Sequence, residues 1–316
     1  MKASTHSVNR ISNKEPRRRG FLQTSRQQEV LWFWLTVSPW LVGFVVFTLG
    51  PVVASMYLSF TNWDFFNPPQ LIGLDNYRLL LNNDLFWKVL SNTFYYALLA
   101  VPLGLVIATA LAYLLNQQIR GMRFYRTLFY LPSLVPIVVA SFVFVWLLAP
   151  AGLINDFLGV FGLDGPRWLL DEAWVKPALV IMSLWGVGGA MVLILAGMQG
   201  IPIELYEAAQ LDGAGERQLF WRITLPMLTP ILFFNLVIGV IASLQTFTQV
   251  YLMTSGGPNN ASMMMVPFLF QIGFEFYRMG QASAVAWILF VIILLLTLLV
   301  FRSSSLWVFY ESEVKR

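Results

Sequence analysis

EAAQLDG at residues 207–213, followed nine residues later by ITLP at residues 223–226, is the stretch that decides the fold. This short polar segment separates two long runs that contain no charged residue, 177–203 and 223–274. Uncharged apolar runs of this length are typical of membrane-spanning helices, which need roughly 20 residues. The sequence therefore predicts an all-α membrane protein in which residues 200–226 form a polar connection between two spans.

The composition also indicates a membrane protein. Of the 316 residues, 58% are hydrophobic and 11% are charged, whereas soluble domains carry about 25% charged residues. No cysteine is present, which excludes disulfides, thiolate chemistry and cysteine-ligated metals, and the single histidine, His6, lies in a polar tail. We therefore predict no metal site and no catalytic residue. We attribute the net charge of +4 to membrane topology and not to nucleic acid binding.

Six runs without Asp, Glu, Lys or Arg divide the chain. We expect one transmembrane helix in each, at about 31–60, 89–115, 128–149, 177–199, 228–253 and 280–301. The fifth run is too long for one helix, and the Gly-Gly-Pro at 256–258 should end the helix within it. The remainder, residues 261–274, is predicted to form an outer or re-entrant segment. The predicted transmembrane domain thus covers residues 31–302.

The distribution of basic residues predicts the orientation of these helices. With a cytoplasmic N-terminus, 15 of the 20 Lys and Arg residues lie inside, mostly in the tails 1–30 and 303–316 and in the second and fourth connections. The positive-inside rule then puts both termini in the cytoplasm. The first apolar run is longer than the apolar region of a signal peptide, which has 7–15 residues, so we expect this helix to be retained. The five basic residues expected outside are Arg78, Lys88, Arg167, Lys176 and Arg278.

The predicted spans contain no ionisable side chain apart from tyrosine. Proton pumps, voltage sensors and intramembrane proteases usually carry charged groups or His within the membrane, so this absence argues against those classes. Sodium coupling through hydroxyls and backbone carbonyls stays open. The sequence also lacks a Gly-x-x-x-x-Gly-Lys-Ser/Thr loop for binding ATP. Energy must therefore enter through another subunit, and the polar connection 200–226 is its expected entry point.

Uncharged polar and small residues follow a helical spacing in the fifth predicted span. They recur at steps of three or four residues, with two further polar residues beside them: Asn235, Gly239, Ala242, Thr246 and Gln249, flanked by Ser243 and Gln245. In the simpler interpretation, small and amide side chains hold membrane helices together. The alternative is a hydrophilic passage wall, since amides both donate and accept hydrogen bonds. Ser183 and Trp185 in the fourth span leave the same alternatives, helix packing or contact with a sugar.

Four sequence features together resemble the carbohydrate branch of the ABC importer permeases. Residues 207–226 reproduce the EAA loop of that family: EAA, three residues, G, nine residues and I-x-L-P. IGLDNY at 72–77 resembles the outer segment before the second helix, RFYRTLFYLP at 123–132 the entry to the third, and TSGGP at 254–258 the loop after the fifth. The resemblance covers nearly the whole chain and implies the six-helix, MetI-like fold of type I importer permeases.

The resemblance also implies partners and a location. A second, homologous permease would complete the passage, two ATP-binding subunits carrying ATP and Mg²⁺ would dock inside, and an extracytoplasmic solute-binding protein would deliver the substrate. The location would be the cytoplasmic membrane of a bacterium or archaeon, surrounded by membrane lipid. The chain itself would be no enzyme and would hold no cofactor.

The EAA loop is the expected docking element for an ATP-binding subunit. Residues 203–211 are predicted to form a short helix that begins after Pro202 and ends near Gly213. The small alanines would permit close approach of the partner, and the carboxylate of Glu207 would face a basic group. The residues expected to couple the chain to ATP hydrolysis are Glu207, Ala208, Ala209, Asp212 and Gly213.

The residues expected along the substrate path are Ser133, Ser183, Trp185, Ser243, Gln245, Thr246 and Gln249. Several depart from the larger permease of the maltose importer, which has Asn at the positions of Ser243 and Thr246 and Tyr at that of Ser133. The resemblance implies a sugar or oligosaccharide as the substrate, and these departures leave open which one it is. The alternatives are a glycerol-phosphate-type importer or, from a different class, a passive channel that works without ATP.

Overall fold

The computed structural model describes residues 21–117 and 119–309. Within these residues the chain is helical, apart from loops and one isolated β-bridge between Thr61 and Leu71. It forms two compact units, Met1–Ser55 and Met56–Arg316. The elements, with η for π- and 3₁₀-helical turns, are α1 Phe21–Phe44, η1 Val45–Leu49, α2 Gly50–Leu58, α3 Asp75–Leu81, α4 Asp84–Leu115, α5 Met122–Tyr130, η2 Leu131–Leu134, α6 Ile137–Leu147, α7 Leu153–Val160, α8 Val175–Trp185, α9 Gly188–Gln199, α10 Ile203–Leu211, α11 Glu216–Leu219, η3 Phe220–Thr224, α12 Leu225–Leu244, α13 Thr248–Thr254, α14 Met265–Phe270, η4 Gln271–Glu275 and α15 Met279–Trp307.

The first predicted span is one uninterrupted helical segment. α1, η1 and α2 follow one another directly, and Arg26–Leu58 is a 33-residue candidate span. α1 includes residues 21–30 of the predicted tail 1–30, which contain no Gly or Pro to interrupt a helix. Residues 1–20 and 310–316 of the two predicted tails lie outside the described residues.

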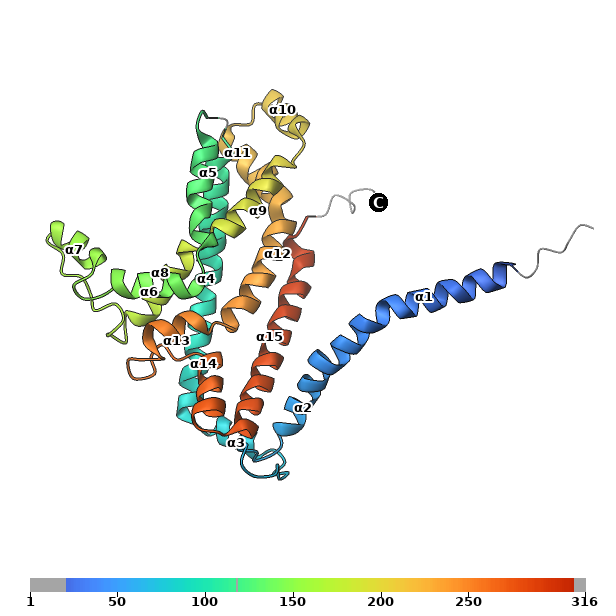
Figure 1. Ribbon diagram of the computed structural model, residues 1–316. Helices are drawn as coiled ribbons and strands as arrows, with labels where there is room; N and C mark the ends of the chain where they lie inside the picture. The colour runs from blue at the N-terminus through green and yellow to red at the C-terminus, as the bar shows by residue number, and fades with distance from the viewer. Residues whose placement is uncertain (1–20, 118, 310–316) are drawn as a thin grey trace, which may run out of the picture. The chain divides into compact units, whose positions relative to one another are not determined.

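α4 is the central helix of the second unit. The Asn83 side chain caps its N-terminus by accepting a hydrogen bond from the Leu85 N–H at 2.9 Å. At the other end the Arg126 guanidinium donates two hydrogen bonds to the Leu115 carbonyl, where a cation also suits the helix dipole. α8, α9 and α12 pack against α4, and α15 packs along α12 (Figure 1). α10 and α11 lie at one end of this unit, and α3 and α14 lie at the opposite end.

Two predicted spans are bent pairs of helices. α5 and η2 meet α6 at 96°, and α8 meets α9 at 46°. Pro132 lies in η2, Pro136 directly precedes α6, and Gly186 directly follows α8. Proline lacks a backbone N–H donor and glycine gives the backbone more freedom, so both residue types favour a break in a helix. The prediction of single helices at 128–149 and 177–199 was therefore wrong. The described residues contain four helices long enough to cross a membrane, or up to six if each bent pair is one span.

The fifth predicted helix, 228–253, is also divided. α12 ends at Leu244, residues 245–247 are not helical, and Gln249 lies on the separate helix α13. The predicted polar stripe therefore does not continue along one helix face. The break contains neither Gly nor Pro, so contacts made by the folded chain must hold it open. The last helix, α15, continues past the predicted end at 301 to Trp307.

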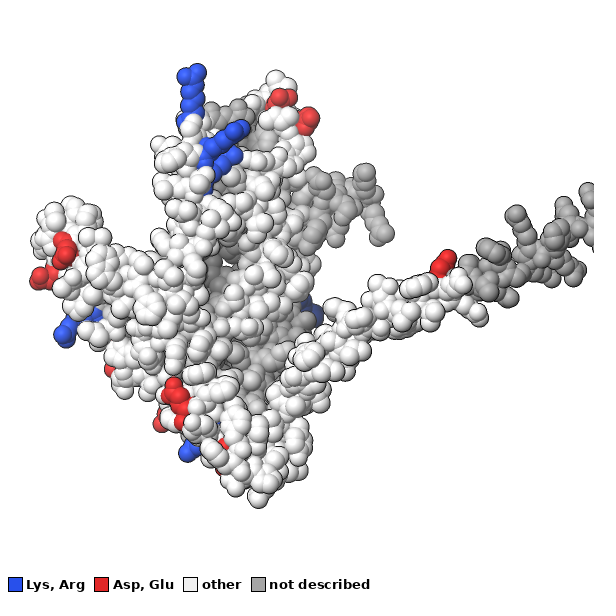
Figure 2. All heavy atoms as spheres, viewed as in Figure 1, with Lys and Arg blue, Asp and Glu red and all other residues white. Residues whose placement is uncertain are grey.

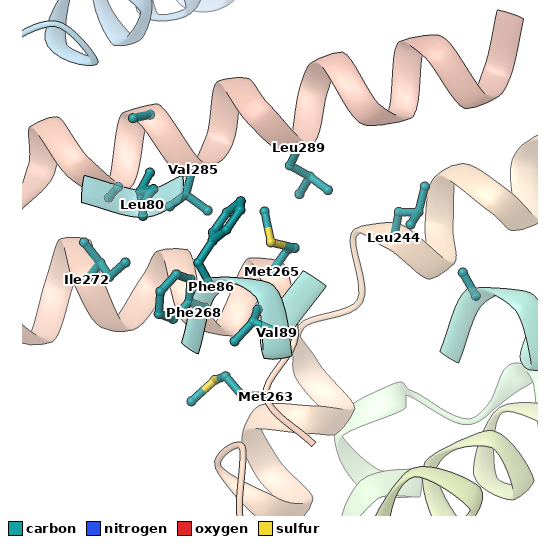
Figure 3. Packing of buried hydrophobic residues seen from close by; sticks show 13 residues of the cluster. Leu80, Phe86, Val89, Leu244, Met263, Met265, Phe268, Ile272, Val285 and Leu289 are labelled. Atoms are coloured by element: carbon teal, nitrogen blue, oxygen red, sulfur yellow. The ribbon is translucent and has the colours of Figure 1, made fainter. Parts of the chain in front are cut away.

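A cluster of buried apolar side chains holds α3, α4, α14 and α15 together (Figure 3). Leu80 and Phe86 are 0% and 1% exposed and face Met265, Phe268 and Val285. Met265 and Phe268 belong to an apolar helix, Met265–Glu275, that is shorter than a span. The predicted outer or re-entrant segment 261–274 thus packs onto α4 and α15 as a short helix.

Charged side chains avoid the middle of the second unit. On the face shown in Figure 2, charged atoms lie near the end that carries α10, at the side around α7 and towards the opposite end, and the surface between these groups is almost uncharged. α15 adds a continuous apolar side formed by Leu294, Leu295, Leu298 and Leu299, which are 45–62% exposed. Such a surface suits contact with lipid chains.

Candidate coupling helix and translocation site

The EAA segment forms the predicted helix, α10. Pro202 precedes its first residue, and Asp212 follows its last. Gly213 then turns the chain with a left-handed backbone angle, φ 83°, which glycine adopts without the strain that a Cβ would add. The local sequence therefore determines both ends of this helix.

α10 presents both acidic and apolar groups at its surface. Glu207 and Ala208 are exposed, and Ala209 is half-buried. Ile203 and Leu211 are 62% and 91% exposed. Exposed apolar side chains grouped with a carboxylate on one short helix are suited to docking another protein.

A hydroxyl pair connects α10 to the membrane-spanning part. The Tyr206 hydroxyl lies 2.9 Å from Thr224 Oγ1, and either oxygen can donate. Thr224, which is 5% exposed, ends the π-helical turn η3 and directly precedes α12. This contact therefore links α10 directly to the start of α12.

A first cavity, of about 390 Å³, lies between α4, α12 and the break that separates α8 from α9. All its lining residues are uncharged, and several are small. Helix breaks that border a polar cavity are a common way to build a solute site in membrane transporters. The polar lining residues are Tyr96, Ser183, Asn235, Ser243 and Thr246.

A second cavity, of about 320 Å³, lies at the bend between η2 and α6. Its polar lining residues are Ser133, Ser183 and Gln249, and Trp185 adds an aromatic ring. Gly188 lets the start of α9 approach the end of α5, because a Cβ at this position would lie 2.6 Å from the Phe129 carbonyl oxygen. Ser183 lines both cavities, which are therefore neighbours at the α8–α9 break.

The serine and threonine hydroxyl groups of both cavities donate to carbonyl groups of their own helices or turns. Ser133, Ser183 and Ser243 donate to the carbonyl three residues earlier at 2.6, 2.6 and 3.0 Å. Thr246 donates to the Ala242 carbonyl at 3.4 Å. A hydroxyl has one proton and two lone pairs, so these groups offer acceptors to the cavities. A solute with many hydroxyl donors complements them.

A buried hydrogen bond lies between the two cavities. Gln249 Nε2 donates to the Tyr96 hydroxyl at 2.5 Å, and the two residues are 6% and 4% exposed. Sequence reasoning missed Tyr96. A signal existed in the sequence. Asn92, Tyr96 and Ala100 recur at steps of four residues along α4, which is a helical spacing, and Thr93 lies beside them.

The structure brings together six of the seven residues predicted along the substrate path. Ser243 and Thr246 line the first cavity, Ser133, Trp185 and Gln249 line the second, and Ser183 lines both. The Trp185 ring also packs edge-to-face against Phe144, with centroids 5.6 Å apart. Gln245 is exposed in the break after α12 and lines neither cavity. It does not lie one helical turn from Gln249, because the helix is interrupted between them.

The loop that carries TSGGP is held in place by Asn92 of α4. Asn92 is 2% exposed and donates to the carbonyls of Asn260 and Met263, both at 3.0 Å. Lys176 Nζ donates to Asn92 Oδ1 at 3.1 Å, and Lys88 Nζ donates to the Asn259 carbonyl at 2.6 Å. α4, α8 and this loop are thereby linked next to the cavities.

These features define a multi-pass α-helical membrane protein whose helices are interrupted around uncharged polar cavities. The sequence model of the binding-protein-dependent transport system inner membrane components matches residues 85–306. This match covers most of the chain, which therefore belongs to that family and is a transport subunit, not an enzyme. The predicted family resemblance is confirmed.

Relatives and solved structures agree with this assignment. The probable ABC transporter permease YesP of Bacillus subtilis is 42% identical over 283 residues, covering 88% of this chain and 91% of that protein. The multiple sugar-binding transport system permease MsmF of Streptococcus mutans is 30% identical over 278 residues, covering 87% and 95%. A chain in the structure of a bacterial ABC transporter that imports the acidic polysaccharide alginate is 25% identical, with a TM-score of 0.79 and coverage of 90% and 98%. The predicted all-α permease fold is confirmed.

Proposed function

We propose that this permease imports a neutral sugar or short oligosaccharide as one of two homologous membrane subunits. The observation that carries the proposal is the pair of uncharged polar cavities at helix breaks. Their volumes, about 390 and 320 Å³, are typical of small-molecule sites. Their hydroxyl acceptors and the Gln249 amide complement a solute rich in hydroxyl groups. The name of MsmF, which refers to sugars, supports the same class.

The uncharged linings favour a neutral solute over an anionic one. A phosphate or carboxylate favours Arg or Lys in its site, and neither type lines the two cavities. Lys88 and Lys176 lie near the start of α4 and α8, and each donates a hydrogen bond to a neutral oxygen of the chain. A glycerol-phosphate-type substrate would therefore need its charge partner on another subunit.

Energy in this proposal comes from two ATP-binding subunits, which would hold ATP and Mg²⁺. The docking element would be α10, with its exposed carboxylate at Glu207 and its exposed Leu211. A solute-binding protein would deliver the sugar on the other side of the membrane. In this arrangement α10 and both chain termini would be cytoplasmic, as the positive-inside rule predicts.

The proposal can be tested with the complete complex in proteoliposomes. Mg-ATP is enclosed, the solute-binding protein is added outside, and a glycan panel identifies the sugar that this protein binds. Uptake of that sugar should require both ATP and the binding protein. Equal uptake without ATP would indicate a passive channel instead. A binding protein that takes only phosphorylated or otherwise anionic solutes would contradict the neutral substrate.

A further inference from the structure

We propose that Tyr96 and Gln249 form a partition between the two cavities, which the solute opens by replacing their mutual hydrogen bond. This inference rests on the proposed function, since it needs a solute with hydroxyl groups. It assigns a role to Tyr96, a residue on the central helix α4 that lies outside the predicted substrate path.

Each residue of the pair lines a different cavity. Tyr96 lines the first cavity and Gln249 lines the second, while Ser183 lines both. The hydrogen bond between the pair is 2.5 Å long and joins residues 153 positions apart in the chain. Thr246 lines the first cavity beside Tyr96. The hydrogen-bonded pair therefore lies where the two cavities adjoin.

The chemistry of the pair allows a sugar to take its place. Both side chains are almost fully buried, and a buried polar group without a partner is costly. The hydrogen bond gives each of the two residues a partner in the other. A sugar hydroxyl can donate and accept at once, so it can bond to the amide and to the phenol together. The pair is neutral, and a single neutral hydrogen bond contributes only about 0.5–1.5 kcal/mol net.

The two partners belong to different helices, which are far apart in the sequence. Tyr96 lies on α4, which packs against α8, α9 and α12. Gln249 lies on the seven-residue helix α13, which is separated from α12 by the break at 245–247 and packs against α6 beyond the 96° bend. A movement of α6 relative to α4 would carry Gln249 away from Tyr96 and join the cavities.

Cysteine labelling tests the partition directly, because the chain contains no cysteine. Ala190→Cys reports on the first cavity and Ser133→Cys on the second, since each residue lines only that cavity. Both are prepared in the full complex with cysteine-free partner subunits, in proteoliposomes without nucleotide. A membrane-impermeant maleimide is applied from the side that reaches Ala190→Cys. With the pair intact, Ser133→Cys should react more slowly from that side.

Tyr96→Phe and, separately, Gln249→Leu should increase the labelling of Ser133→Cys from that side roughly two- to tenfold, the equivalent of one net hydrogen bond. Tyr95→Phe is the matched control: Tyr95 is the neighbouring residue, lines neither cavity and faces Lys176 with its ring at 4.9 Å, a contact that phenylalanine keeps. Complex yield checks assembly.

Equal labelling of both cysteines with the pair intact would overturn the partition. So would an unchanged labelling rate in both Tyr96→Phe and Gln249→Leu. Sugar uptake in the same proteoliposomes tests the proposed function separately. If no variant, including the unaltered chain, takes up sugar while Tyr96→Phe still speeds labelling, the partition stands and the proposed function fails.

Discussion

The Tyr206 hydroxyl and Thr224 Oγ1 lie 2.9 Å apart and join α10, the candidate coupling helix, to the segment that continues into the spanning helix α12. Tyr206 directly precedes Glu207, and Thr224 directly precedes α12. α12 in turn carries Asn235 and Ser243, which line the first cavity. One side-chain contact therefore connects the expected docking surface with a helix of the solute passage.

Tyr206→Phe should lower the coupling between ATP hydrolysis and uptake, because it removes this contact without removing the ring. We expect the uptake per ATP hydrolysed to fall roughly two- to tenfold while ATPase activity is retained. Thr224→Val should have the same effect, and the double variant should be no worse than either single one. Tyr125→Phe, at an exposed tyrosine of α5, is the control. Additive losses in the double variant would show that the two residues act independently.

Gly213→Ala should destabilise the end of α10, because the backbone angle there is left-handed (φ 83°) and a Cβ in that region costs about 1–2 kcal/mol. Gly215→Ala is the matched control, since both positions have open space around them and Gly215 has φ −81°. Co-purification of the ATP-binding subunits and their stimulated ATPase activity should fall only in Gly213→Ala. Equal behaviour of the two variants would contradict a strain-based role.

Thr246→Val should slow uptake roughly two- to tenfold, because it removes a hydrogen-bond acceptor from the first cavity at nearly constant shape. Thr109→Val is the matched control. Thr109 likewise donates to the carbonyl four residues earlier, Leu105, but it does not line either polar cavity. Uptake is measured at a saturating concentration of loaded binding protein. If Thr246→Val transports normally, Thr246 serves helix packing and not the solute.

Asn92→Ala should loosen the TSGGP loop, because it leaves the Asn260 and Met263 carbonyls without their side-chain donor. The expected loss of stability is about 1–3 kcal/mol, visible as a lower thermal midpoint and faster proteolysis at residues 255–264. Asn82→Ala, at an exposed asparagine, should change neither. An unaltered midpoint in Asn92→Ala would show that packing alone holds the loop.

Uptake should be indifferent to proton and sodium gradients, because the residues that line the two cavities are uncharged and coupling ions usually need an ionisable ligand. Proteoliposomes with Mg-ATP inside should keep their uptake rate after ionophores collapse both gradients. A loss of uptake with ATP maintained would show that an ion is coupled to transport.

The sequence by itself determined the membrane class, the apolar segments and the short helix α10. These properties are local: an uncharged run of about 20 residues must form a helix in lipid, and Pro202 and Gly213 bound α10 through their own backbone preferences. The bends at Pro132, Pro136 and Gly186 were also marked by residue type, although each of the two spans was predicted as a single helix.

Only the tertiary structure decided where the cavities lie and what separates them. The break at 245–247 contains no Gly or Pro, so no local rule predicts it, and it moves Gln249 off the face that carries Asn235 while leaving Gln245 exposed. Tyr96 and Gln249 meet although 153 residues separate them. The physical reason is that their hydrogen bond depends on how α4 packs beside α12 and α13 packs against α6, and packing between distant segments leaves no periodic pattern in the sequence.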